Sequence, residues 1–243
     1  MKNWQSTIGI GFIAIVCTYL LAQAYTYKFK NAETIVVTGL AEKDFTSDQI
    51  VWKGTFTRTN SDLKQVFAQI QTDAAAVKNY LRSKGVADSS VELSSVEVNK
   101  NYNQQYDGNG NPAGSVFSGY TLSNEVKIDS RNIALVEKIS REITELLQTG
   151  IEINSQKPSY YFSQLNTLKI DLLSQASKDA KLRATTIADA SDGKLGSMKK
   201  ATMGVFQITG KNDNESYSYG GSFNTSSKEK TASITLKVEY TVD

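Results

Sequence analysis

Histidine is missing from this chain of 243 residues, and its absence excludes several kinds of chemistry at once. Ser-His-Asp and Cys-His catalysis, zinc sites with histidine ligands and acid–base catalysis by imidazole all require that side chain. The one cysteine, Cys17, lies in an apolar run, so no disulfide can form within the chain and no cluster of thiolates can hold a metal. We therefore expect neither a cofactor nor a metal site.

A surplus of positive charge is also missing from most of the chain. The 27 Lys and Arg residues exceed the 25 Asp and Glu residues by only two, and three of the lysines fall in residues 1–30, which hold no acidic residue. The remainder has 24 basic and 25 acidic residues, a net charge of −1. A protein that binds nucleic acid through its phosphates needs a basic surface, so we expect no nucleic-acid partner.

One long hydrophobic run is present near the N-terminus, in residues 8–24, and the uncharged stretch continues to Tyr27. Counted to Tyr27 it has 20 residues, about the length that a helix needs to span the hydrocarbon of a bilayer. One interpretation is an uncleaved single-pass anchor in the inner membrane, with tyrosines at the outer interface. The other is a signal peptide that is cleaved after Ala24, at an A-x-A triplet. Both place the body of the protein outside the cytoplasm, on the periplasmic side of the cell envelope.

Periodic hydrophobic residues predict the secondary structure of the body. The expected helices are residues 61–84, 131–149 and 165–190, and the expected strands are residues 34–44, 49–59, 91–106, 116–128, 151–162, 198–209 and 233–242. This order, ββα-ββα-βα-ββ, favours an α+β fold in which three helices pack on a mainly antiparallel sheet, preceded by the hydrophobic N-terminal helix. We expect residues 1–30 to be the signal anchor or signal peptide and residues 31–243 to form one α+β domain.

Three strands have a face that we expect to be buried, because apolar residues recur at every second position. In two of them the predicted faces are Ile50, Trp52, Gly54 and Phe56, and Val116, Tyr120, Leu122, Val126 and Ile128. The last strand alternates from Ser233 to Val242, which is typical of a strand buried on one side. If that strand lies at the edge of the sheet, its unpaired backbone groups favour self-association.

Several segments together resemble a known family. They are Thr34-Ile-Val-Val-Thr-Gly39, Lys84-Gly85-Val86, Gly119-Tyr120-Thr121-Leu122-Ser123-Asn124-Glu125-Val126, and an alanine-rich helix followed by Gly193-Lys194-Leu195-Gly196. In their order and spacing, over residues 34–242, the chain resembles the SIMPL domain family of bacterial envelope proteins. The opening Val-Thr-Gly-Leu-Ala-Glu42 and the apolar N-terminal segment are similar to its membrane-anchored branch.

The resemblance implies an α+β fold, an extracytoplasmic location and a homo-oligomer of ring-like or channel-like form. It also implies an association with tolerance of oxidative stress. The family has no agreed catalytic residues, so none can be transferred to this sequence.

Four tyrosines are candidates for contact with a partner or another subunit: Tyr102, Tyr106, Tyr217 and Tyr219. They lie in polar, glycine-rich loops, where exposed rings can stack on sugars or anchor a partner. A flexible loop with incidental tyrosines is the alternative. Asn124 is the one polar residue on the apolar face of its strand, and we expect its amide to tie a bulge or a neighbouring loop.

Two patterns could carry catalysis, and both have a simpler interpretation. The Ser-x-x-Lys spacing of a serine acyl-enzyme occurs at Ser191–Lys194, Ser197–Lys200 and Ser227–Lys230, but the S-D-N and K-T-G signatures that accompany it are absent. Glutamates 137, 142 and 145 alternate with basic residues, as on an ordinary solvated helix face. We therefore expect that the protein is not an enzyme.

Three functions remain open. The first, which we expect, is a non-catalytic envelope protein that self-assembles and supports tolerance of oxidative stress. The second is a membrane-presented binding module for a carbohydrate or a peptide, which requires that the loop aromatics converge in space. The third is a histidine-free hydrolase that uses Ser and Lys.

The N-terminal segment gives the first testable prediction. We expect it to be retained as an anchor, because its uncharged run is long enough to span a bilayer. The intact mass of protein extracted from membranes then corresponds to a chain that includes residues 8–27. An N-terminus at Tyr25 would show instead that the segment is cleaved.

Overall fold

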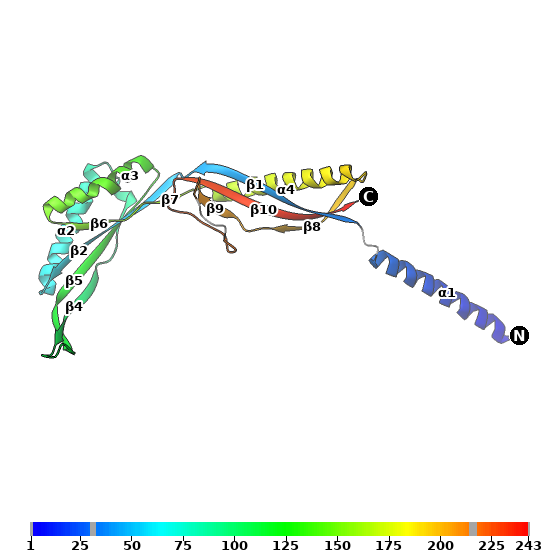
Figure 1. Ribbon diagram of the computed structural model, residues 1–243, viewed down its shortest axis with the longest axis horizontal. Coiled ribbons are helices and arrows are strands. Elements are labelled where there is room, and N and C mark those ends of the chain that lie inside the picture. The colour runs from blue at the N-terminus through cyan, green and yellow to red at the C-terminus, as the bar shows by residue number, and fades with distance from the viewer. Residues whose placement is uncertain (1, 30–32, 214–217, 243) are drawn as a thin grey trace. The chain divides into compact units, whose positions relative to one another are not determined.

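The computed structural model describes residues 2–29, 33–213 and 218–242, and leaves the side chains of residues 2–10 and 26–29 undescribed (Figure 1). The chain divides into two compact units. Unit 1 comprises residues 1–40, 174–204 and 235–243, and unit 2 comprises residues 41–173 and 205–234. The division expected from the sequence, into residues 1–30 and 31–243, stays a prediction.

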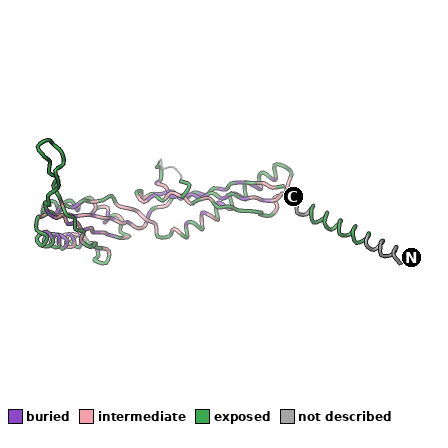
Figure 2. The backbone as a smooth tube through the Cα atoms, turned by 90° about the horizontal axis from the view of Figure 1, so that it is seen from below, coloured by how far each residue is buried: buried purple, intermediate pink, exposed green. Residues whose placement is uncertain are grey.

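The N-terminal segment forms the helix α1 (Lys2–Phe29). Its described side chains, residues 11–25, are exposed on every side, as Figure 2 shows. Within the described part of the chain, we find no helix with the length and apolar character needed for a membrane span. The expected span of residues 8–27 begins and ends among side chains outside the described set, and the anchor stays a prediction.

Unit 2 contains a six-stranded antiparallel sheet, and two helices cover one of its faces (Figure 1). Its main path is β3-β5-β2-β6, while β4 also pairs with β5 and β7 with β2. The strands are β2 (Gln49–Asn60), β3 (Val91–Leu93), β4 (Glu97–Tyr106), β5 (Pro112–Ser130), β6 (Glu152–Ser155) and β7 (Ser159–Tyr161). The helices are α2 (Leu63–Ser83) and α3 (Ile133–Glu142), and α3 continues as the 3-10 helix η2 (Ile143–Thr149).

The core of unit 2 lies between this sheet and the helices. Ile50, Trp52 and Phe56 of β2 are fully buried, as their alternation predicts. The apolar stripes that face them along the helices are Val66, Ile70, Val77, Leu81, Val136 and Ile139. The polar edge of the indole also has a partner, because Trp52 Nε1 donates a hydrogen bond of 3.0 Å to Ser155 Oγ on β6.

A second sheet is built around β10 (Glu229–Val242), the last strand of the chain. In unit 1, β10 pairs antiparallel with β8 (Leu195–Met203) and has β1 (Thr34–Thr46) as its other neighbour. In unit 2, its first residues pair antiparallel with β9 (Gln207–Gly210). The edge position considered for the terminal strand is therefore wrong: β10 lies inside its sheet, and its backbone groups are paired on both sides.

The helix α4 (Leu165–Ala190) packs on this second sheet with a buried face of two leucines and four alanines: Leu168, Leu172, Ala176, Ala180, Ala184 and Ala188. Ala176, Ala180 and Ala184 are fully buried. A Cβ atom added at Gly39 of β1 would collide with the carbonyl oxygen of Ala176 and lie 2.7 Å from the backbone nitrogen of Ala180. Small side chains on both elements thus let the helix backbone approach the strand directly.

The α+β class with antiparallel sheets is confirmed, and the described residues contain four α-helices. The expected single sheet is two sheets, because β1 is a neighbour of β10 while the next strand, β2, pairs with β5. Two long predicted strands are also each interrupted. The strand expected at 91–106 breaks at residues 94–96 into β3 and β4, and the strand expected at 198–209 breaks at 204–206 into β8 and β9. Helix α2 begins one residue after its cap Asp62, whose carboxylate accepts hydrogen bonds from the backbone of Lys64 and Gln65.

The close approach at Gly39 gives a test of the packing in unit 1. We expect Gly39→Ala to destabilise the protein by about 1–3 kcal/mol, because the backbone of α4 must move to admit the methyl group. A loss of that size lowers the melting temperature of unit 1 by roughly 4–8 °C per kcal/mol, measured by calorimetry. The matched control is Gly108→Ala, at a site with no neighbour within 4 Å; equal melting temperatures for the two variants would contradict the packing argument.

Candidate functional site

The β4–β5 hairpin carries two of the candidate tyrosines, Tyr102 and Tyr106, and is exposed over most of its length. In Figure 1 the two strands continue past the ends of α2 and α3, and Figure 2 shows that this part is exposed along its length. A compact turn closes the tip: Asp107 Oδ1 accepts hydrogen bonds of 2.9 Å from the backbone nitrogens of both Asn109 and Asn111. The hairpin is therefore an ordered ribbon, with its strands paired to the last residue before the turn.

A β-bulge lies where the hairpin leaves the core. Asn101 pairs with Gly119 and Tyr102 pairs with Phe117, so Ser118 is an extra residue on β5. Gly119 has a φ of 140°, and an added Cβ atom would lie 2.8 Å from the carbonyl oxygen of Asn60. Only glycine meets both requirements at this position.

The bulge gathers three aromatic rings on one face of the hairpin. Phe117 packs edge-on against Tyr102 and against Tyr120, with ring centroids 5.9 and 5.0 Å apart. In a regular strand, two residues three positions apart, such as Phe117 and Tyr120, point to opposite faces, and the bulge between them brings them to the same face. We call Tyr102, Phe117 and Tyr120 the ring cluster; two of its members, Tyr102 and Phe117, are 57% and 43% exposed.

The same bulge corrects the predicted face of β5. Leu122, Val126 and Ile128 are buried as expected, but Val116 is exposed and pairs with Asn103 on the other face. The sequence pattern assumed unbroken alternation from residue 116 to residue 128. One extra residue at Ser118 reverses the alternation towards the tip.

The four candidate tyrosines are not brought together as a group. Tyr102 belongs to the ring cluster, while Tyr106 lies at the tip, opposite Pro112. Tyr219 is fully exposed in the loop after β9, and Tyr217 lies outside the described residues. Sequence reasoning missed Phe117, although the glycine two residues after it, a frequent marker of bulges, was a usable signal.

Asn124 lies at the break between β3 and β4. Its side chain is buried, and its Oδ1 accepts a hydrogen bond of 3.3 Å from Ser94 Oγ. The same hydroxyl accepts a hydrogen bond of 3.0 Å from the backbone nitrogen of Glu125. The amide thus binds the segment that interrupts the edge strand, which is a structural use of this residue.

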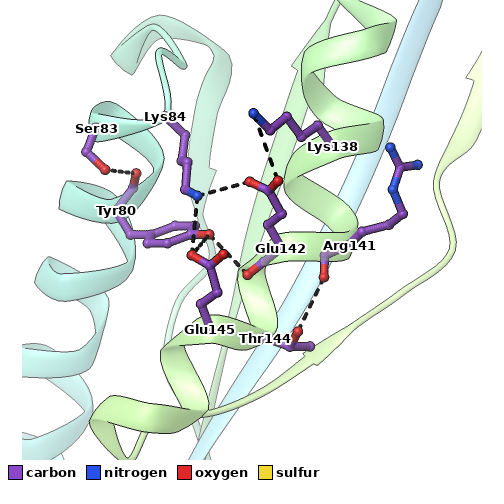
Figure 3. Close-up of polar contacts among 8 residues, drawn as sticks. All are labelled: Tyr80, Ser83, Lys84, Lys138, Arg141, Glu142, Thr144 and Glu145. Atoms are coloured by element: carbon purple, nitrogen blue, oxygen red, sulfur yellow. Dashed lines mark hydrogen bonds and ion pairs between the residues drawn. The ribbon is translucent and has the colours of Figure 1, made fainter.

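A second polar group joins the end of α2 to the end of α3, as Figure 3 shows. Lys84 Nζ lies 2.9 Å from Glu142 Oε2 and 3.2 Å from Glu145 Oε2. The hydroxyl of Tyr80 donates hydrogen bonds to the backbone oxygen of Glu142, at 3.1 Å, and to Glu145 Oε2, at 3.0 Å. We call these four residues the ionic cluster.

The charge states of Lys84 and Glu145 favour a structural role for the ionic cluster over a catalytic one. Hydrogen bonds from Lys84 to Glu142 and with Tyr80 raise the pKa of that lysine above its ordinary value, so its amine stays protonated. Hydrogen bonds from Tyr80 and Lys84 lower the pKa of Glu145, so its carboxylate stays ionised. Burial, as the largest cause, raises the pKa of Tyr80. A protonated lysine is neither a nucleophile nor a base.

In two of the three Ser-Lys pairs, one member is bonded in a way that differs from a catalytic dyad. Ser191 Oγ donates a hydrogen bond of 3.0 Å to the backbone oxygen of Ile187, inside its own helix. Lys230 is buried, and its Nζ donates hydrogen bonds of 2.6 Å to the carbonyl oxygens of Tyr160 and Asn224. Across the described part of the chain, no group of three or more potential metal ligands is found.

Comparison with protein families gives one match. The model of the SIMPL family, described as a protein of unknown function (DUF541), matches residues 35–243. The matched range includes the hairpin and the ionic cluster. The curated proteins contain no match to this chain.

The ionic cluster gives a prediction for pH dependence. The pKa of Glu145 in the folded protein lies below its ordinary value of 4.5, so its stabilising effect is present above that value and is lost as the pH falls through the folded pKa. We therefore expect unit 2 of the wild type to lose stability more steeply on acidification than Glu145→Gln does. The measurement is the urea midpoint between about pH 3 and 7, followed by Trp52 fluorescence with Trp4 replaced by Phe.

The matched control is Glu97→Gln, which removes an exposed glutamate outside the cluster. Its urea midpoint should follow the wild type over the same pH range. Identical acid profiles for wild type and Glu145→Gln would mean that the cluster adds nothing to stability.

Proposed function

The chain belongs to the SIMPL family, and we propose on this basis that it is a non-catalytic cell-envelope protein, anchored by residues 8–27, that self-assembles through the β4–β5 hairpin. The body lies on the periplasmic side of the inner membrane in this proposal. The proposal includes a role in tolerance of oxidative stress, which the family resemblance implies. The observation that carries self-assembly is the exposed ring cluster.

The ring cluster has the chemistry of a subunit contact. Aromatic rings are enriched at the centres of protein interfaces, where they often contribute most of the binding energy. Tyr102 and Phe117 expose about half of their surface to water, although they already pack edge-on against each other. Strand β4 pairs only with β5 within the described sheet, so its other edge is available for pairing with another chain. A second copy can cover both the rings and this edge.

The anchor is supported by the surroundings of α1. The described part of this helix exposes Phe12, Ile13, Ile15, Val16, Leu20 and Leu21. A helix that is apolar on all sides is stable in water only if something covers it, and a bilayer covers every side at once. This agrees with the similarity of the N-terminal segment to the membrane-anchored branch.

The absence of catalysis is supported by the state of the candidate groups. The amines of Lys84 and Lys230 donate hydrogen bonds to oxygen atoms, and the hydroxyl of Ser191 is bonded within its helix. Each of these three groups is thus engaged as a donor. These contacts support the non-enzymatic function over the Ser/Lys hydrolase.

A binding module for a carbohydrate or a peptide is the second candidate, because a ring cluster can also stack on a sugar. Sugar sites combine rings with nearby hydrogen-bonding groups. On the hairpin, however, four of the five amides of β4 lie on the face opposite the rings, because the strand alternates: Asn99, Asn101, Asn103 and Gln105. Gln104 is the one amide of β4 on the face of the rings. This separation favours the contact between subunits.

Replacement of the rings tests self-assembly. We expect Tyr102→Ser with Phe117→Ser to lower the assembly mass of the full chain in detergent, because two rings at central positions change a dissociation constant by roughly 100-fold or more. The measurement is light scattering after size exclusion at about 100 μM protein, where interfaces with a dissociation constant of about 10 μM are populated.

The matched control replaces Asn103 and Gln105 by Ser, on the same strand but on the opposite face. Its assembly mass should equal that of the wild type. A wild-type protein that is strictly monomeric would exclude self-assembly. An intact assembly that binds glycan strands only when the rings are present would favour the binding module.

A further inference from the structure

A basic surface lies on the outer face of the second sheet in unit 1, opposite the face that α4 covers. A shallow groove there is lined by Val36, Lys200, Thr202, Lys237 and Glu239. In the pairing of β10 with β8, Lys237 lies opposite Thr202 and Glu239 opposite Lys200, so these residues share one face.

A register shift adds a third lysine to this surface. Glu239 pairs with Lys200 and Tyr240 pairs with Met198, so Lys199 is the extra residue of a bulge. Its Nζ lies 3.3 Å from Glu239 Oε1, which places its charge beside the groove. The surface formed by Val36, Lys199, Lys200, Thr202, Lys237 and Glu239, here called the lysine face, therefore carries three positive charges and one negative charge.

Exposed aliphatic side chains border the lysine face. On β1, Val37, Gly39 and Ala41 are buried and the residues between them point outward. Val36 and Leu40 are accordingly 51% and 42% exposed. Lysines beside exposed aliphatic residues are a combination typical of surfaces that contact lipid headgroups.

The distribution of charge between the two units agrees with lipid contact through unit 1. By sequence, unit 1 has 10 basic and 6 acidic residues, whereas unit 2 has 17 basic and 19 acidic residues. Two of the basic residues of unit 1, Lys28 and Lys30, fall at the end of α1 and directly after it. The unit that contains the proposed anchor is thus the positively charged one.

The connection between α1 and the lysine face is short. Seven residues lead from Phe29, the last residue of α1, to Val36, and an extended chain of that length spans at most about 25 Å. With α1 in a bilayer, the lysine face can therefore reach the headgroups. Attraction of lysines to anionic lipid acts within roughly a Debye length, about 8–10 Å.

We propose that the lysine face binds the headgroups of anionic phospholipids in the same membrane that holds α1; this rests on the proposed function of α1 as an anchor. The ammonium groups of Lys199, Lys200 and Lys237 pair with lipid phosphates. The hydroxyl of Thr202 donates to phosphate oxygens. Unit 1 then lies against the membrane instead of moving freely on its linker.

The test uses the full chain in nanodiscs of phosphatidylcholine alone, or with about 30% phosphatidylglycerol. A water-soluble amine-reactive reagent reports the accessibility of each lysine by peptide mass spectrometry. Because one lysine near an anionic surface contributes roughly fivefold in binding, we expect labelling of Lys199, Lys200 and Lys237 to slow at least about fivefold in the anionic discs. Lys178 and Lys181, exposed on α4, should react equally in both, and about 1 M salt should abolish the difference.

Matched charge reversals complete the design. Lys200→Glu with Lys237→Glu should remove the protection of Lys199, whereas Lys178→Glu with Lys181→Glu should leave it unchanged. Protein that elutes apart from both kinds of disc would overturn the anchor, and this inference with it. Protein that elutes with the discs but labels equally in both lipids overturns this inference alone. Protection that is independent of lipid charge and fades on dilution would assign the face to a second copy and also overturn it.

Discussion

The second sheet depends on β10, the last strand of the chain. β10 has β1 on one side and pairs with β8 and β9 on the other, so each of these strands is held in its sheet by this one neighbour. Its buried residues Leu236, Val238 and Tyr240 supply the inner face, while Lys237 and Glu239 supply the outer one. The alanine face of α4 and the lysine face are therefore the two sides of a single central strand. A strand in this position carries both the packing of unit 1 and the surface that we assign to lipid.

Local patterns predicted the individual elements well. The alternation of Ile50, Trp52 and Phe56 predicted the buried face of β2, and the spacing of buried alanines predicted α4 from residue 165 to residue 190. These features depend on neighbours two to four residues apart, which is the range that sequence periodicity reports. The division into two sheets was not predictable in the same way. It depends on which distant strands become neighbours: β1 lies beside β10, at the other end of the chain, whereas β2 pairs with β5.

The candidate sites, too, could be predicted from the sequence only in part. The tyrosines of the hairpin could be found because they lie in a polar, glycine-rich segment, and Asn124 because it is polar on an apolar face. The ionic cluster joins Lys84 to glutamates 58 and 61 residues away, and helical spacing alone makes those glutamates look like a solvated surface. Phe117 entered the ring cluster only through the bulge. Pairing across long separations decides which side chains meet, and a single sequence does not report it.

The bulge at Ser118 also separates the length of the hairpin from the face that each side chain takes. Removal of Ser118 would leave Phe117 two positions before Tyr120, so the alternation of a regular strand would still place both rings on one face. The pairs Asn101–Gly119 and Tyr102–Phe117 would become consecutive, and Val116 would stay opposite Asn103 on the other face. Loss of this one residue would therefore remove the bend of the bulge but keep the aromatic surface. A related chain could straighten this ribbon by one codon of length and still present the same rings.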